Sequence, residues 1–218
     1  MRTTTAKRAG LACALLVAGL AATTAPAQAD QQAGIADIGS ADFTKAGEPT
    51  TVPTQGRCSI DGPTSAVAES VSQAGITFGG GTSSCTTTVT DPGTDATTTT
   101  STATGKNFEL SALVSVGGPR VKLSTFTVTC TATRTQTSTN WSYGGMAGIP
   151  ALPNPVPPGY VAPIKKRDGT VLANAVFNAQ TLPGDGSIDL TMLEITFLPA
   201  SGISGHVVLG ETACAPTQ

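Results

Sequence analysis

Residues 125–140 read TFTVTCTATRTQTSTN, with threonine at every second position from Thr125 to Thr139. The residues between these threonines are apolar from Phe126 and turn polar after Ala132. A period of two residues is typical of a β-strand, whose successive side chains project to opposite faces. β-Branched threonine suits a pleated, solvated face. We therefore expect a strand with a threonine face toward water, whose other face enters the core at Phe126 and leaves it near Ala132.

The segment before this strand predicts its hairpin partner. Apolar and polar residues alternate over 107–116, which indicates a half-buried strand. The Gly-Gly-Pro sequence at 117–119 predicts a turn, after which the chain returns toward the threonine stretch. Because the apolar residues Leu123 and Phe126 fall out of phase, we expect a β-bulge near Ser124.

Further strands are expected after a proline-rich loop. Residues 149–163 read IPALPNPVPPGYVAP and predict an extended loop, since proline cannot donate to a sheet ladder. The pair Asp168-Gly169 predicts a tight turn. Later strands are expected at 170–177, 187–198 and 203–212. Many short strands separated by glycine and proline turns predict an all-β fold, either an antiparallel β-sandwich or an open barrel, with little helix.

The first 29 residues have the form of a cleaved secretory signal peptide. Three basic residues precede an uninterrupted apolar run at 11–22, and Ala27-Gln28-Ala29 supplies a cleavage site. The apolar run is shorter than the ~20 residues that span a bilayer. We therefore expect no transmembrane segment in the mature chain, and a protein that is secreted, either extracellular or loosely associated with the cell wall.

The mature chain is expected to contain a single folded domain. Residues 30–57 show little apolar periodicity, which predicts a flexible N-terminal segment or one edge strand. Residues 65–73 fit either a short helix or a loop. One β-sandwich domain is then expected over residues 58–215.

The composition excludes several classes of protein. Only 12% of the residues are charged, where folded domains usually have about a quarter. The 12 basic residues are outnumbered by 14 acidic ones, so there is no electrostatic footprint for nucleic acid. One histidine and one tryptophan leave few groups from which to build a cofactor site. We expect no nucleic-acid partner and no cofactor.

The cysteines predict disulfides rather than a metal site. Cys13 lies in the predicted signal peptide, which leaves Cys58, Cys85, Cys130 and Cys214 in the mature chain. An even number of cysteines in an oxidising compartment indicates two disulfides, for which three connectivities exist. No two of these cysteines have the close spacing of zinc ligands, so no metal is expected.

Three runs of this sequence resemble the actinobacterial choice-of-anchor P domain. They are TVTCTATR at 127–134, GSIDLTMLEITFL at 186–198 and GHVVLGETAC at 205–214. That family pairs a cysteine of a mid-domain strand with one in the last strand, which implies the disulfide Cys130–Cys214 and hence Cys58–Cys85. The family is found on secreted and surface proteins and has no established activity. The resemblance therefore implies a noncatalytic β domain of the cell exterior.

Two sets of residues are candidates for binding. Lys165, Lys166 and Arg167 form a basic run beside the predicted turn, which suits an acidic wall polymer or is simply a solvated hairpin tip. Trp141, Tyr143 and Tyr160 lie near the proline-rich loop, which either docks a partner or serves as a connector. The expected partner is a cell-wall polymer or another extracellular protein.

Catalytic and metal-binding candidates are weaker. Glu109 and Glu194 lie within apolar strands and are the pair that a secreted hydrolase of wall polymer would use. His206 lies in a strand with no nucleophile motif and is expected to be structural. Asp185 and Asp189 are possible calcium ligands, but a turn accounts for them equally well.

The threonine stretch also has a sharper interpretation. Threonine ladders on flat β-faces resemble those of some ice-binding proteins, which carry the pattern on several adjacent strands. Here the pattern is strict only over 125–139, and the consecutive run at 97–100 places threonine on both faces of a strand. The sequence therefore predicts an ordinary solvated face. It also predicts a noncatalytic, secreted or envelope-associated structural or binding module, with the hydrolase and a partner-binding or inhibitor module as alternatives.

Overall fold

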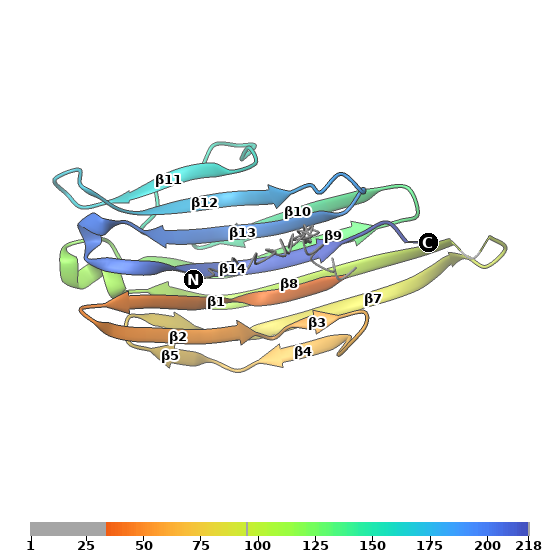
Figure 1. Cartoon of the computed structure of the whole chain (residues 1–218), viewed down its shortest axis with the longest axis horizontal. Helices are drawn as coiled ribbons and strands as arrows, with labels where there is room; N and C mark the ends of the chain where they lie inside the picture. The colour runs from red at the N-terminus through yellow and green to blue at the C-terminus, as the bar shows by residue number, and fades with distance from the viewer. Residues whose placement is uncertain (1–33, 95, 218) are drawn as a thin grey trace, which may run out of the picture.

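Two antiparallel β-sheets pack face to face in the computed structural model (Figure 1), which describes residues 34–94 and 96–217. The predicted all-β sandwich is therefore confirmed. The predicted signal peptide and residues 30–33 lie outside the described residues, as do Asp95 and Gln218.

Sheet A is built around the first and last strands of the described chain. In order across the sheet it contains β11 (Tyr160–Lys165), β12 (Val171–Thr181), β13 (Ile188–Phe197), β14 (Ile203–Cys214), β1 (Ile35–Lys45) and β2 (Glu48–Gln55), with the short β3 (Cys58–Ser59) also paired to β1. The described part of residues 30–57 forms two strands, of which β1 lies between β14 and β2 and β2 ends the order of the sheet. The predicted flexible segment is therefore wrong, and the predicted edge strand describes only β2. The domain begins with β1 rather than at Cys58.

Sheet B contains the remaining strands. In order it has β10 (Thr137–Gly144), β9 (Val121–Ala132) and β8 (Ala96–Leu110), and β8 pairs along most of its length with β7 (Gly81–Asp91) and near its end with β6 (Ile76–Phe78). The outermost strands are β4 (Ser65–Ala68), paired with β7, and β5 (Val71–Gln73), paired with β6. The segment that fits a helix or a loop by sequence is thus strand.

Two short 3₁₀ helices, η1 (Ala112–Val116) and η2 (Pro199–Ser201), connect strands. The strand predicted over 107–116 is wrong beyond Leu110, where η1 follows. Ser111 and Ala112 both donate their backbone N–H to the Gly75 carbonyl, at 2.8 and 2.9 Å, and this contact turns the chain out of the sheet.

The threonine stretch forms two strands rather than one. β9 leaves the core at Ala132, as predicted, and the chain then turns. In this turn the Thr133 N–H donates to the Gln136 carbonyl and the Gln136 N–H donates to Thr133 Oγ1. The threonines of β10 consequently lie on the opposite face of the sheet from those of β9, because Thr137 pairs with the inward-facing Ala132.

Both sheets bend along a line that crosses their strands. In sheet B the buried residues change from odd to even positions between Gly105 and Phe108 of β8, and the same change occurs on β9 between Leu123 and Phe126. The register of the two strands does not shift there, so the phase change is confirmed but the predicted one-residue bulge near Ser124 is wrong. Asn107 lies at this point with φ +50°.

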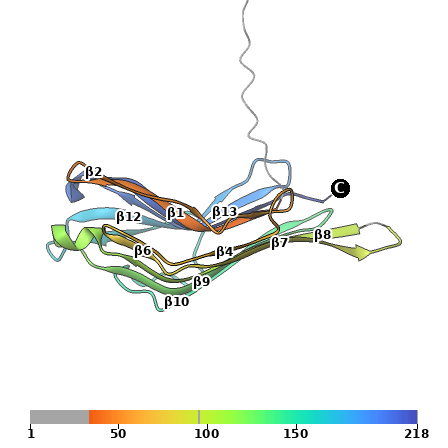
Figure 2. The same cartoon turned by 90° about the horizontal axis from the view of Figure 1, so that it is seen from below.

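Sheet A bends in the same way, as Figure 2 shows for β1 and β13. Asn178 of β12 and Gly210 of β14 have φ values of +55° and +66° on this line. A side chain at Gly210 would lie 2.8 Å from Val128 Cγ1 of the facing sheet, so the two sheets are in close contact where sheet A bends.

The core between the sheets is apolar and is closed by two disulfides. Its largest members are phenylalanines from both sheets: Phe43, Phe78, Phe108, Phe126 and Phe177. Cys58–Cys85 joins β3 to β7, and Cys130–Cys214 joins β9 to β14, so each disulfide links sheet A to sheet B. The pairing implied by the family resemblance is the one observed.

Candidate functional site

Trp141 and Tyr143 lie together at the edge of the sandwich. Both project from β10, the edge strand of sheet B, on the side that faces sheet A. Their rings stack with centroids 5.9 Å apart, and the Trp141 ring also stacks on Phe177 of β12 at 6.2 Å. Tyr143 is 37% exposed and Trp141 is half-buried, so each ring presents part of its surface to water.

The proline-rich loop forms the opposite wall of an open groove beside these rings. We call it the aromatic groove; it has a volume of about 590 Å³ and is lined by residues 140–143 and 152–156. Leu152 and Val156 of the loop pack against the core. The predicted loop over 149–163 is confirmed up to Gly159, and the residues after it belong to β11, an edge strand that tolerates Pro163.

Asn178 fixes the loop in this position. The side-chain amide of Asn178 donates to the Val156 backbone carbonyl at 3.2 Å, and the backbone carbonyl of Asn178 accepts the Gly159 N–H at 2.9 Å. Gln180 Nε2 donates to Asn178 Oδ1 at 2.8 Å. Asn178 has the positive φ that asparagine tolerates better than most residues. The role of Asn178 was not predicted, because nothing in the local sequence indicates a contact with a residue 22 positions away.

The other predicted binding residues lie elsewhere. Tyr160 begins β11 directly opposite Phe177 and packs against the core, so it supports the aromatic cluster without lining the groove. The basic run is the tip of the β11–β12 hairpin, where the Lys166 N–H donates to the Thr170 carbonyl. Five strand positions, or about 17 Å, separate Tyr160 from Lys165. Lys165, Lys166 and Arg167 are therefore not part of the aromatic groove.

The two glutamates predicted for a hydrolase do not meet. Glu109 belongs to β8 of sheet B and Glu194 to β13 of sheet A. Glu109 binds Lys122 at 3.2 Å and also Arg120, and these hydrogen bonds lower the pKa of its carboxyl. Glu194 accepts a hydrogen bond from Thr196 Oγ1 on its own strand. The structure therefore gives no paired-carboxylate site from these two residues.

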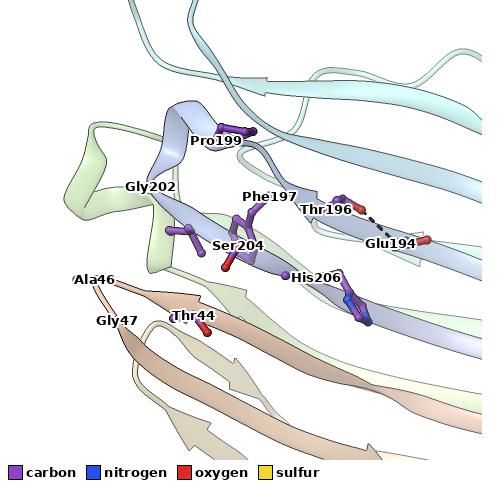
Figure 3. A pocket seen from close by; sticks show the side chains of 12 residues that line it. Thr44, Ala46, Gly47, Glu194, Thr196, Phe197, Pro199, Gly202, Ser204 and His206 are labelled. Atoms are coloured by element: carbon purple, nitrogen blue, oxygen red, sulfur yellow. Dashed lines mark hydrogen bonds between the residues drawn. The ribbon is translucent and has the colours of Figure 1, made fainter.

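Glu194 and His206 instead line a groove on the outer face of sheet A, shown in Figure 3. This groove has a volume of about 650 Å³ and is bounded by the β1–β2 turn, with Ala46 and Gly47, and by η2. His206 lies directly opposite Thr196 on β13 and Asp42 on β1. Among the residues that line this groove, Thr196 is hydrogen-bonded to Glu194 (Figure 3), and no described residue is hydrogen-bonded to the His206 side chain.

A buried acid pair on sheet A was not predicted. Asp37 of β1 and Glu211 of β14 are directly opposite each other, and Arg57 Nη1 lies 4.0 Å from Asp37 Oδ2. Asp37 is 2% exposed, and its Oδ1 has no hydrogen-bond partner among the described residues. Burial raises the pKa of Asp37 to about 7; Glu211 raises it further and Arg57 opposes both effects. Burial also raises the pKa of Glu211.

Of the two predicted calcium ligands, Asp185 stabilises a turn and Asp189 lies within β13. Asp185 Oδ1 accepts the Ser187 N–H at 2.9 Å and the Ser187 hydroxyl, and these bonds lower the pKa of Asp185. Burial raises the pKa of Asp189, and the nearby Asp185 adds to this effect. Across residues 34–94 and 96–217, no three His, Cys, Asp or Glu side chains gather in a way that would hold a metal ion.

Comparison with protein families, with curated proteins and with solved structures finds no match to this chain. Membership of the choice-of-anchor P family therefore stays a prediction. Among the described helices, none has the length and apolar character needed to cross a membrane.

Proposed function

We propose that this protein is a noncatalytic binding module of the cell exterior, which holds an uncharged segment of wall polysaccharide in the aromatic groove. The stacked pair Trp141–Tyr143 is the observation that carries this proposal. A sugar ring has an apolar face of C–H groups, and an aromatic ring face is the complementary partially negative surface. The parts of the two rings that remain exposed to water offer such a surface beside the groove.

The other residues of the groove support a polar but uncharged ligand. Asn154 of the loop supplies a donor and an acceptor for hydroxyl groups of the ligand. Every side chain that lines the groove is uncharged, which disfavours an ionic ligand. Binding sites commonly combine an apolar surface with a few polar groups that fix the orientation of the ligand.

The groove is suited to binding without turnover. Its lining contains no carboxylate, histidine or cysteine to act as an acid, base or nucleophile. The acid whose pKa is most raised, Asp37, lies on sheet A and is too buried to touch a ligand. Two disulfides between the sheets suit an oxidising compartment, which supports secretion by the predicted signal peptide.

The test uses the secreted protein with its disulfides intact. Trp141 is the only tryptophan of the chain, so its fluorescence reports directly on the groove. Titration with soluble fragments of the producing cell's wall polysaccharide should shift the emission of Trp141 saturably. Tyr143→Ala, which removes half of the platform, should weaken binding at least tenfold, or about 1.4 kcal/mol.

Leu182→Ala is the matched control, because Leu182 is 67% exposed and lies outside the groove. It should leave the affinity unchanged. Equal affinities of the wild type and Tyr143→Ala would exclude the groove as the binding site. A Trp141 emission that does not respond to any wall fragment would favour the alternative partner, another extracellular protein docked on the proline-rich loop.

A further inference from the structure

The outer face of sheet B carries hydroxyl residues at almost every position over four adjacent strands. Strands β10, β9, β8 and β7 each contribute alternate residues to it, and they meet in direct register. Read from β10 to β7, three successive rows are Ser142–Thr127–Thr104–Thr82, Asn140–Thr129–Thr102–Ser84 and Ser138–Thr131–Thr100–Thr86. We call this array the threonine face.

The structure corrects the expectation that the pattern is confined to one strand. The consecutive run at 97–100 does place threonine on both faces of β8, but the outward members continue the rows of β9. Thr99, which faces inward, is buried and its hydroxyl lies 2.9 Å from that of Thr87. The run at 97–100 therefore contributes residues both to the inward face of β8 and to the threonine face.

Neighbouring hydroxyls hold one another in fixed positions on this face. Thr102 and Thr129 are hydrogen-bonded through their Oγ1 atoms at 3.2 Å, and so are Thr104 and Thr127. The β-branched side chain already restricts χ1. Ladders of hydrogen-bonded side chains also help to keep a sheet flat. The rows lie in the half of sheet B on one side of the bend that Figure 2 shows.

The chemistry of the threonine face excludes most partners. Its rows contain no charged side chain: Lys106 lies at the bend and Glu109 beyond it, and Asp91 and Arg134 lie at the other end of the rows. Without cations it does not suit a polyanion. Without aromatic rings, methionine or arginine it lacks the residues that dominate protein interfaces, where serine is depleted.

We infer that the threonine face binds the surface of ice. Its methyl and hydroxyl groups repeat at about 4.8 Å across the strands and about 6.7 Å along them. A partner that makes use of similar polar residues repeated in two directions is itself periodic, uncharged and able both to donate and to accept hydrogen bonds. A crystalline water surface meets these conditions. This inference does not depend on the rings of Trp141 and Tyr143, which lie on the inward side of β10.

The test measures thermal hysteresis and the inclusion of the secreted protein in slowly growing ice. The wild type should separate the freezing and melting points of a seeded crystal and should be enriched in the ice fraction. Thr129→Lys places a long charged chain in the middle row and should reduce both effects at least tenfold. Thr196→Lys, an exposed position on the outer face of sheet A, is the matched control and should retain them.

Exclusion of the wild type from growing ice, without hysteresis, would overturn the inference. Equal ice-binding activity of the wild type and Thr129→Lys, with the same thermal unfolding of both proteins, would also overturn it. Tyr143→Ala should keep its ice activity, and Thr129→Lys should still shift the Trp141 emission with polysaccharide. The failure of one proposal is thus separable from the failure of the other.

Discussion

Asp37 is the residue whose ionisation most affects the stability of the sandwich. In the folded protein its pKa is raised from the usual 3.8 to about 7, chiefly by burial. Between these two values the unfolded chain loses the proton while the folded protein keeps it. Stability from this group is therefore complete below about pH 3.8 and decreases as the pH rises toward 7.

Asp37→Asn should remove this dependence. Each pKa unit corresponds to about 1.4 kcal/mol, so the wild type should lose up to about 4 kcal/mol from this group between pH 4 and pH 8. The variant should consequently gain stability relative to the wild type as the pH rises, as measured by denaturant unfolding at both values. Asp42→Asn, on the exposed side of the same strand, is the control. A constant difference between Asp37→Asn and the wild type would contradict this explanation.

Asn178 connects an element of the fold to the candidate site. It lies where β12 bends, and its side chain holds the loop that forms one wall of the aromatic groove. Asn178→Gly keeps the positive φ but removes the bonds to Val156 and Gln180, and should destabilise the protein by about 1 kcal/mol. It should also alter the emission of Trp141 before any ligand is added.

Asn107→Gly provides the comparison for this change. Asn107 has a similar φ of +50° at the bend of sheet B, and its side chain forms no hydrogen bond with a described residue. The substitution should be nearly neutral in thermal unfolding. If Asn178→Gly and Asn107→Gly lose the same stability, Asn178 stabilises the protein through its backbone conformation and not through its contact with the loop.

The strand conformation of β9 and β10 was predicted from the sequence, whereas the turn between them and strand β1 were not. The alternation over 125–140 correctly predicts strands and the point at which the chain leaves the core, but it does not reveal the turn at Thr133, because the period of two continues through it. β1 was missed since Gly39 reverses its buried face, from Ala36 and Ile38 to Ala41 and Phe43.

The candidate site was predictable only in part. The sequence predicted the proline-rich loop and named Trp141 and Tyr143 as binding residues near it. In the structure the two rings and the loop line one groove. The acid pair Asp37–Glu211 and the rows of the threonine face depend on the register between strands up to 174 positions apart, and a local pattern does not contain that register.

As a whole, the molecule depends on its two disulfides to hold one sheet on the other. Replacing both cysteines of a pair by alanine should cost about 2–5 kcal/mol in either case. Cys130–Cys214 spans 84 positions and Cys58–Cys85 spans 27, so loss of the longer loop should cost about 1 kcal/mol more by chain entropy. Denaturant unfolding of the two double variants measures this difference, and the reverse order would show that local packing outweighs loop length.

The most direct test of the proposed function is co-sedimentation of the secreted protein with purified, insoluble wall polymer from the producing cell. We predict saturable binding by the wild type and by Leu182→Ala, with at least tenfold weaker binding by Tyr143→Ala. Retention of the wild type in the supernatant at every polymer concentration would contradict the proposal that the aromatic groove is a wall-binding site.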